Sequence, residues 1–301
     1  ISSRQYAGRS AITNRVPSVS TTGTPCCFAS SIARSVAAGI GSPGFPPTAV
    51  TCLGVRYSDT DGSRIGSAII YTAGLPATTL DLLVRGDPEM FERMARLIEP
   101  GRRAAAIVFA DLQASGILSR RHSSASYFDL IRELTTAIDE VVGAHGGIVG
   151  KHAGDGVTAF FLATELGSAS SAARAALDAS RAIGEAAARV AGELDGVEPV
   201  DVLMNVGAHW SGALYLGQVV TGGRLEVTAL GDEMNECARI QASARDGSVL
   251  ATKALLEQLA PAESEAVGID PDRIAYRTLA ELPGADEKSI RDAGSVAVAD
   301  V

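Results

Sequence analysis

The order of the apolar segments between residues 104 and 209 restricts the fold of this chain more than any other feature. Short runs that suit buried strands alternate with longer segments whose apolar residues recur with the spacing of one helix face. The expected elements are a strand at 104–111, a helix at 123–144, a hairpin at 147–161, a helix at 168–194 and a strand at 200–209. This β-α-β-β-α-β order is the split βαβ arrangement of ferredoxin-like sheets. We therefore predict an α/β (α+β) domain built on such a sheet.

Further elements extend this core toward the C-terminus. Strand-like segments at 213–220 and 225–230 flank a Gly-rich loop, and a helix follows over 232–244. A last strand is expected near residues 295–298. The predicted domain thus carries extra strands and helices beyond the βαββαβ core.

A change of composition near residues 85–103 indicates a domain boundary. The chain before it is rich in Ser, Thr, Gly and Pro, which favours loops and short strands. Its elements are expected as strands at 49–57 and 65–71 with a turn at 59–62 between them, and a helix at 89–98 is expected as the connector to the next domain. We predict a small α/β module at 1–85, either a sensor or a scaffold and not necessarily complete at its front, a helical linker at 86–102 and the ferredoxin-like domain at 103–301.

The bulk composition excludes several classes of protein. The chain has 301 residues, of which 46% are hydrophobic and 20% charged, as in ordinary globular proteins. A net charge of −9 argues against a nucleic-acid-binding face, which needs concentrated basic residues. No apolar run reaches the roughly 18 residues of a membrane span, and residues 1–25 lack the apolar core of a signal peptide. The four cysteines lack the spacing of a zinc site, so we expect a reduced, cytoplasmic chain.

Two acidic side chains are expected at the ends of neighbouring strands. Asp111 closes the first apolar run, and Asp155 lies in a Gly-Asp-Gly turn of the hairpin. Hard divalent cations such as Mg²⁺ or Mn²⁺ take oxygen ligands and keep positions open for phosphate. The pair therefore predicts a metal site. The polar stretch 113–116 that follows Asp111 can offer backbone N–H groups to an anion at a helix N-terminus.

A third polar motif lies on the helix expected at 232–244. Asn235 and Arg239 are four residues apart, so they project from one face of that helix. The guanidinium of Arg239 has a donor fork that suits phosphate oxygens, and Asn235 can donate and accept hydrogen bonds beside it. Taken alone, the same pattern describes an exposed polar helix face, so its meaning depends on the other motifs.

The three motifs, in this order and spacing, resemble the catalytic domain of the class III nucleotidyl cyclases, in particular the bacterial adenylate cyclases. The resemblance covers residues 103–260. It implies that Asp111 and Asp155, together with the backbone carbonyl of Leu112, hold two Mg²⁺ or Mn²⁺ ions in each active site. It also implies conversion of ATP to 3′,5′-cyclic AMP and pyrophosphate by in-line attack of the ribose 3′-oxygen on the α-phosphorus.

The remaining family positions are filled by competent residue types as well. By the resemblance, Lys151 and Thr228 contact the base, while Asn235 orients the ribose and Arg239 stabilises charge on the α-phosphate. Guanylate cyclases usually carry Glu at the position of Lys151, so the lysine favours ATP. The family also forms its sites across a two-fold homodimer. One subunit would then supply the two aspartates, and the partner would supply the other four side chains.

One loop departs from the family pattern. Cyclases usually carry Gly-Phe-Thr where this chain has Ala114, Ser115 and Gly116, and that loop normally cradles the phosphates. Ser115 and Gly116 are small enough for backbone contacts with substrate, so we interpret the change as variation within an active enzyme. Two alternatives stay open: a cyclase-like module that binds nucleotide with little or no turnover, and a purely structural dimerisation domain. His152, beside Lys151, is expected to face the opposite way and to bind no metal.

Overall fold

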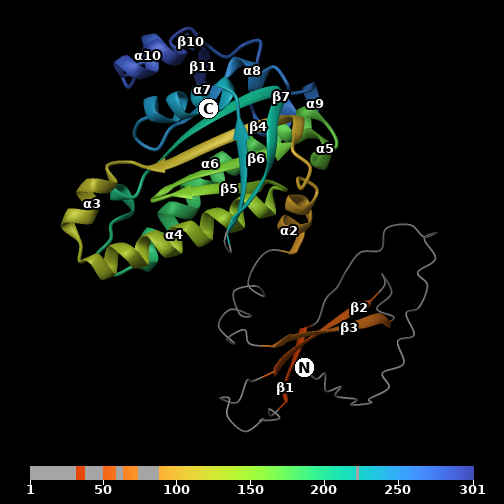
Figure 1. Cartoon of the computed structure of the whole chain (residues 1–301). Helices are drawn as coiled ribbons and strands as arrows, with labels where there is room; N and C mark the ends of the chain where they lie inside the picture. The colour runs from red at the N-terminus through yellow and green to blue at the C-terminus, as the bar shows by residue number, and fades with distance from the viewer. Residues whose placement is uncertain (1–31, 38–49, 59–63, 74–87, 222–223) are drawn as a thin grey trace, which may run out of the picture. The chain divides into compact units, whose positions relative to one another are not determined.

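The computed structural model describes residues 32–37, 50–58, 64–73, 88–221 and 224–301 (Figure 1). The chain divides into two compact units, Ile1–Arg85 and Gly86–Val301. The described part of the first unit is an antiparallel sheet in which β2 lies between β1 and β3. Its strands are β1 (Ile32–Ala37), β2 (Val50–Ser58) and β3 (Arg64–Ala73). The two strands predicted for this module are confirmed, and the turn predicted at 59–62 lies outside the described residues.

The second unit is built on one mixed sheet. Its described strands follow the order β10-β11-β9-β7-β4-β6-β5, and β8 pairs with β7 beside this path. Their bounds are β4 (Gly101–Leu112), β5 (Ile148–Ala153), β6 (Gly156–Leu162), β7 (Met204–Thr221), β8 (Arg224–Leu230), β9 (Val249–Thr252), β10 (Arg277–Thr278) and β11 (Ala297–Asp300). The central pairs β4–β6 and β4–β7 are antiparallel, whereas β7 and β9 run parallel. The predicted mixed α/β fold with a βαββαβ core is confirmed.

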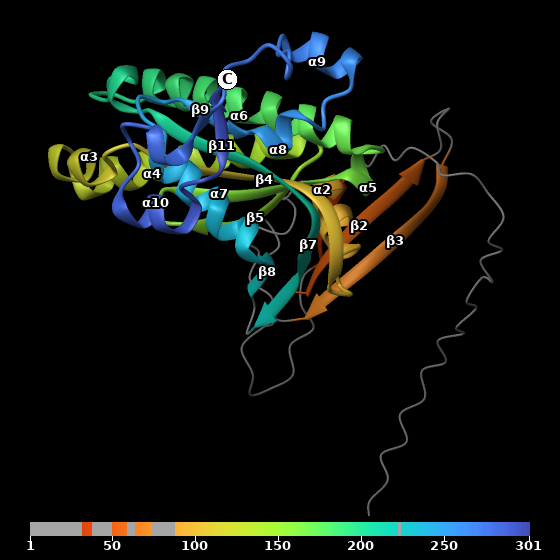
Figure 2. The ribbon, with the colours of Figure 1, turned by 90° about the horizontal axis from the view of Figure 1, so that it is seen from above.

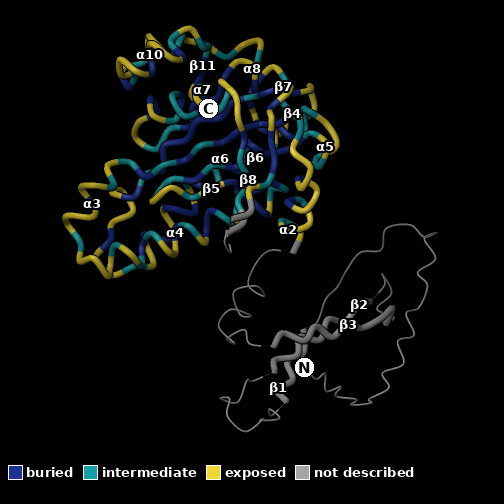
Figure 3. Tube along the Cα trace, viewed as in Figure 1, coloured by how far each residue is buried: buried dark blue, intermediate teal, exposed yellow. Residues whose placement is uncertain are grey.

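Two long helices cover one face of this sheet. They are α4 (Ser124–Ala144) and α6 (Ala169–Glu193), close to the predicted ranges. Each begins at a serine, Ser123 or Ser168, whose side-chain oxygen accepts a hydrogen bond from a backbone N–H of the first turn. The alanines of α6 are small, so this helix packs closely on α4 and on the even-numbered residues of β4, from Ala106 to Leu112. Dark blue marks this buried layer in Figure 3.

The opposite face is covered by α7 (Asp232–Ser243), α2 (Pro88–Ala95) and the β8 hairpin. Figure 2 shows α6 on one side of the sheet and α7 on the other. Odd-numbered residues of β4, such as Ile107, pack here with Phe160 and Cys237. Gly207 of β7 lets α7 approach closely, because a Cβ there would come within 2.5 Å of a backbone nitrogen of the helix. Asp111 has the same parity as Ile107, so its side chain belongs to the α7 side.

Shorter elements complete the unit. They are α3 (Ser115–Arg121), α5 (Ala163–Leu166), α8 (Lys253–Leu256), α9 (Pro261–Val267), α10 (Glu287–Ala293) and the 3₁₀ turns η1 (Pro199–Asp201) and η2 (Leu279–Glu281). The sequence pattern missed most of them, because elements of three to seven residues hold too few turns to show a period. Among the described residues, no helix combines the length and the apolar character needed to span a membrane.

The strands after α6 differ from the prediction. A strand was expected at 200–209, but residues 199–201 form η1 and the strand begins at Met204. The separate strand expected at 213–220 is part of the same strand, because β7 continues to Thr221. Pairing with β4 continues on both sides of an irregularity, because Ala105 pairs with Ser211 and Arg103 pairs with Leu214, with a register shift between Arg103 and Ala105. The final strand, β11, lies two residues later than expected.

Candidate functional site

Asp111 and Asp155 come together at one end of the β4–β6–β5 strands. Asp111 lies one residue before the end of β4, and Asp155 lies in the turn between β5 and β6. A Cβ on Gly156 would come within 2.8 Å of the Asp111 Oδ1 atom, so the turn rests directly on that carboxylate. Burial, reinforced by repulsion from Asp155, raises the pKa of Asp111 to about 6. The two carboxylates thus form a like-charged pair.

This pair suits a divalent cation. A cation between the carboxylates would remove their repulsion and favour the ionised form of Asp111. No group of three or more His, Cys, Asp or Glu side chains capable of holding a metal occurs in the described residues. The remaining ligands would therefore be backbone carbonyls, water or phosphate, which are the ligands that Mg²⁺ retains beside one or two carboxylates. Leu112, whose carbonyl is expected from the sequence to bind the metal, is the last residue of β4.

A β-bulge turns Lys151 toward the same side of the sheet. The pairing of β5 with β6 shifts register between Val149 and Lys151, which leaves Gly150 as the extra residue. Only glycine fits this bulge, because a Cβ would lie 2.6 Å from the Phe160 ring. After the bulge Lys151 pairs with Thr158 instead of following the alternation from Ile148. Its side chain therefore faces the α7 side of the sheet.

His152 faces away from this site, as predicted. Its partner in β6 is Val157, which packs into the core beneath α4 and α6. The His152 Nε2 atom lies 2.8 Å from the Asp139 Oδ1 atom of α4. The ring is thus satisfied by a structural carboxylate, and its expected lack of a metal-binding role is consistent with this contact.

A cavity of about 440 Å³ joins three of the predicted residues. Asp111 and Lys151 line it from β4 and β5, and Thr228 lines it from β8. Met234 and Gln241 of α7 also line it, and neither was singled out in the sequence. The cavity has one acidic and one basic group within an apolar wall, which is the composition of a pocket for a polar ligand with an aromatic or apolar part.

The two predicted residues of α7 lie elsewhere. Asn235 is exposed, and Arg239 Nε lies 3.4 Å from the Asp292 Oδ2 atom of α10. Neither of them lines the cavity that contains Asp111. Within one chain the structure therefore brings Asp111, Asp155, Lys151 and Thr228 into one region and leaves the α7 pair outside it.

The loop after Asp111 has a strained backbone. Ala114 adopts φ 55° and ψ 31°, the left-handed region that costs an L residue roughly 1–2 kcal/mol. Gln113 holds the loop in place, because its side-chain oxygen accepts hydrogen bonds from Asn205 Nδ2 at 3.1 Å and from the Asp246 backbone N–H at 2.7 Å. Ser115 and Gly116 follow in the first turn of α3. The position where cyclases usually carry Gly is thus one where the backbone favours Gly.

Replacing this alanine tests the strain. We expect Ala114→Gly to raise the free energy of unfolding by up to about 1 kcal/mol, because relief of the left-handed strain exceeds the extra backbone entropy of Gly. Denaturant unfolding followed by circular dichroism measures the change. Ala188→Gly, at an exposed position inside α6, is the matched control and should lower stability by about 1 kcal/mol. Equal losses of unfolding free energy in the two variants would show that the backbone at Ala114 is not strained.

Tyr127 is a polar residue of the site that the sequence pattern places only on the apolar face of a helix. Its side chain comes from the first turns of α4 and is hydrogen-bonded to Ser115. Burial raises the pKa of the Tyr127 hydroxyl, and the charges of Asp155 and Asp111 raise it further. The phenol therefore lies near both carboxylates and links them to the α3 loop. The sequence did contain a signal for this role, because Tyr127 places a hydroxyl on an otherwise apolar helix face and a buried hydroxyl needs a hydrogen-bond partner.

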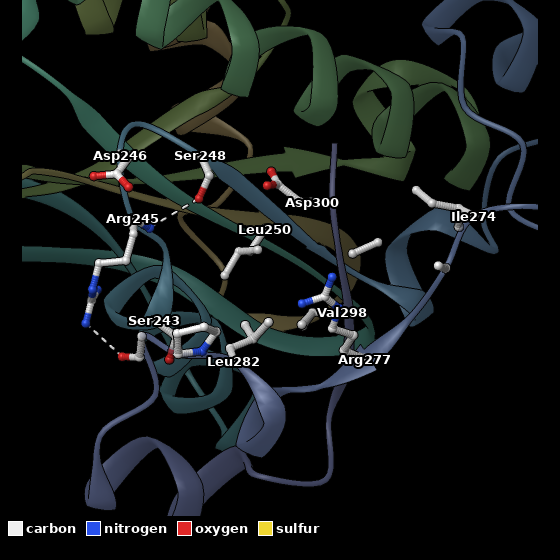
Figure 4. A pocket seen from close by; sticks show the side chains of 14 residues that line it. Ser243, Arg245, Asp246, Ser248, Leu250, Ile274, Arg277, Leu282, Val298 and Asp300 are labelled. Atoms are coloured by element: carbon white, nitrogen blue, oxygen red, sulfur yellow. Dashed lines mark hydrogen bonds between the residues drawn. The ribbon is translucent and has the colours of Figure 1, made fainter.

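A separate cavity of about 740 Å³ lies at the other edge of the sheet (Figure 4). Leu250 of β9 and Val298 of β11 line it, and Arg277 of β10 reaches into it (Figure 4). Arg245 lies at its side, where the Nη2 atom donates a 2.7 Å hydrogen bond to the Gly284 carbonyl. This cavity shares no lining residue with the set predicted from the sequence, so the candidate site is the one at Asp111.

Comparisons with known proteins fall into two groups. No family model and no curated protein sequence matches the chain. Solved structures do match. The adenylyl cyclase CyaB from P. aeruginosa gives a TM-score of 0.51 at 19% identity, over 67% of this chain and 96% of that chain. The guanylyl cyclase Cya2 gives 0.51 at 20% identity, over 67% of this chain and 94% of that chain.

A bacterial light-regulated adenylyl cyclase gives a TM-score of 0.51 at 17% identity, over 74% of this chain and 63% of that chain. Both adenylyl and guanylyl cyclases thus share the arrangement of strands and helices described above, so the likeness does not distinguish between the two substrates. At this level of identity, the shared property is the fold. The chain therefore carries the fold of the adenylyl and guanylyl cyclase catalytic domains.

Proposed function

We propose that this protein is a class III nucleotide cyclase of bacterial type that converts ATP to 3′,5′-cyclic AMP and pyrophosphate. The observation that carries the proposal is the pair Asp111 and Asp155, of which Asp111 lines a cavity that also contains Lys151 and Thr228. In a cyclase fold these residue types have complementary tasks. The carboxylates hold metal ions, and the other two side chains contact the base.

The choice of ATP rests on the base contacts. The amino group of Lys151 is a donor that suits the acceptor nitrogens of adenine, and the Thr228 hydroxyl can donate or accept beside it. Both line the cavity next to apolar surface from Met234 and Phe109, against which a purine ring can pack. A guanine would present a carbonyl in place of the adenine amino group and an N–H donor in place of the adenine N1 acceptor, and that donor calls for a carboxylate at position 151.

The metal and phosphate chemistry follows from the remaining residues. Asp111, Asp155 and the Leu112 carbonyl would hold two Mg²⁺ or Mn²⁺ ions, which when bound activate the ribose 3′-hydroxyl and neutralise the leaving pyrophosphate. Ser115 and Gly116 lie at the start of α3, where backbone N–H groups can contact phosphate oxygens. Asn235 and Arg239 would complete the site at the ribose and at the α-phosphate.

A two-fold homodimer would bring these parts together. One protomer would supply Asp111 and Asp155, and its partner would supply Lys151, Thr228, Asn235 and Arg239. The α7 pair does not line the cavity of its own chain, as expected for residues that act across an interface. The β7–β8 hairpin supports this arrangement. Tyr215 and Leu230 face each other across the two strands, and they are 46% and 67% exposed. Val219, on the same face of β7, is 42% exposed. A row of large exposed apolar side chains is the usual mark of a protein interface. We place the dimer in the cytoplasm, where ATP is available.

A second function is favoured by one observation. The strained Ala114 stands where a cyclase loop cradles phosphates, so the domain could bind nucleotide and turn it over poorly. Binding without product would assign the chain to this second class, a cyclase-like nucleotide-binding module. If the chain neither binds nucleotide nor forms product, the remaining assignment is a structural dimerisation domain.

A turnover assay with ATP and GTP tests the proposal. Purified full chain with Mn²⁺ or Mg²⁺ should form cyclic AMP from ATP and much less cyclic GMP from GTP, with products separated by chromatography. Lys151→Glu should lower the ATP-to-GTP ratio of kcat/KM by on the order of 10-fold or more, because the carboxylate repels adenine nitrogens and accepts from guanine. Lys253→Glu, a surface lysine on α8, is the charge-matched control. An unchanged ratio in Lys151→Glu would remove this residue from the base site.

A further inference from the structure

Helix α10 is firmly attached to α7. Ile240 of α7 and Ala244, the residue that follows this helix, pack with Ala293 of α10 in a separate apolar cluster. The turn before α10 is equally close, because a Cβ on Gly284 would lie 2.1 Å from the carbonyl oxygen of Ser243. The position of α10 is thus fixed relative to the helix that carries Asn235 and Arg239.

Arg239 meets an acidic group of α10 along one edge. Its Nε atom lies 3.4 Å from the Asp292 Oδ2 atom, and the two side chains are 20% and 28% exposed. The Nε atom is buried and makes no hydrogen bond in the described structure, so the ion pair with Asp292 is its compensation. Arg239 in turn helps to lower the pKa of Asp292, after a larger effect of the hydrogen bond from Arg291.

The other edge of the guanidinium remains available. Within the residues that the structure describes, no acceptor takes a hydrogen bond from the terminal nitrogens Nη1 and Nη2 of Arg239. These nitrogens carry four of the five donors of the group. Asp292 therefore fixes the guanidinium through Nε and leaves the fork that binds phosphate oxygens in pairs.

We propose that Asp292 is a positioning residue for Arg239 in the cyclisation reaction, an inference that rests on the proposed function. The carboxylate limits the rotation of a long side chain and holds its Nη atoms ready for the α-phosphate. An arginine that meets the developing charge without reorganising stabilises the transition state more than the bound substrate. Loss of Asp292 should thus lower kcat and leave the KM for ATP nearly unchanged.

A contrary role is also testable. If Asp292 instead held Arg239 away from substrate, its removal would free the guanidinium and raise kcat. The sign of the change in kcat therefore separates positioning from inhibition.

The test is Asp292→Asn in the full chain, assayed with ATP and Mn²⁺. The asparagine keeps the shape of the side chain, and removing a negative charge near the C-terminus of α10 does not oppose the helix dipole, so folding is preserved. We expect kcat to fall by about 10- to 100-fold, as for other small misplacements of a reacting group, with KM within about twofold. Arg291→Gln is the matched control. Arg291 forms an ion pair with the same carboxylate, but its own side chain is 69% exposed, so its loss should leave kcat within about twofold.

A double-mutant cycle shows whether Asp292 acts through Arg239. In an Arg239→Ala background, Asp292→Asn should cost no further activity, because the residue that it positions is gone. Additive losses, an unchanged kcat or a faster Asp292→Asn enzyme would each overturn the inference while the proposed function stands. Absence of turnover in the unmodified chain would overturn the proposed function, and the inference with it.

Discussion

Asp111→Asn is expected to lower cyclic AMP formation by at least about 100-fold, with the same result for Asp155→Asn. Each substitution removes an anionic ligand from the carboxylate pair, and an amide neither holds a divalent cation as tightly nor neutralises it. The measurement is steady-state turnover of ATP with Mn²⁺, followed by product chromatography. Asp139→Asn is a matched control, since Asp139 contacts His152 on the far side of the same hairpin. Retained turnover in either site variant would refute the proposed metal site.

The same Asp111→Asn variant should be more stable than the parent in the absence of metal. The folded-state pKa of Asp111 is raised from 3.8 to about 6, so its ionised form is disfavoured by the fold. This penalty is absent below pH 3.8, grows as the pH rises through about 6 and then stays constant. Melting temperatures of the two proteins should therefore diverge across this interval, with the variant higher at pH 7. A loss of activity together with a gain in stability would indicate that the Asp111 carboxylate serves function, although its charge destabilises the folded state.

Mixing two inactive variants is expected to restore activity. If the metal residues and Arg239 serve opposite sites of a homodimer, a heterodimer of Asp111→Ala and Arg239→Ala protomers contains one intact site. Random exchange in an equal mixture gives half heterodimers with half of their sites intact, so about one quarter of the parent activity should return. The measurement is turnover as a function of mixing ratio, with a maximum near equal amounts.

Two further mixtures of variants determine which residues belong to the same active site. Asp111→Ala with Asp155→Ala is the matched control and should restore nothing, because both residues belong to one protomer's half of each site. Asp111→Ala with Lys151→Ala addresses the cavity in which Asp111 and Lys151 occur together within one chain. Recovery would place them in different active sites of the dimer, as the resemblance implies. Failure of Asp111→Ala and Arg239→Ala to complement would contradict the shared-site dimer.

Much of the fold could be predicted because its core elements have strong periods. The helices α4 and α6 start at serine caps and keep an apolar face over many turns, so their bounds lie close to those expected. The hairpin around Asp155 could also be predicted, because a Gly-Asp-Gly turn lies between two apolar runs. The C-terminal elements from β9 to α10 gave little signal, because each is short and is stabilised by packing on the rest of the unit.

The sequence by itself determined the order of the βαββαβ core and the residue types of the candidate site. It also determined that two acidic side chains lie at the ends of neighbouring strands. Local patterns suffice for these, since turns, caps and periodicity act over a few residues. Only the tertiary structure decided how the groups face one another. The bulge at Gly150 turns Lys151 toward the Asp111 side, the left-handed backbone falls on Ala114, and Asp292 reaches Arg239 from a helix more than fifty residues later. Each depends on register and packing between distant segments, which no local pattern encodes.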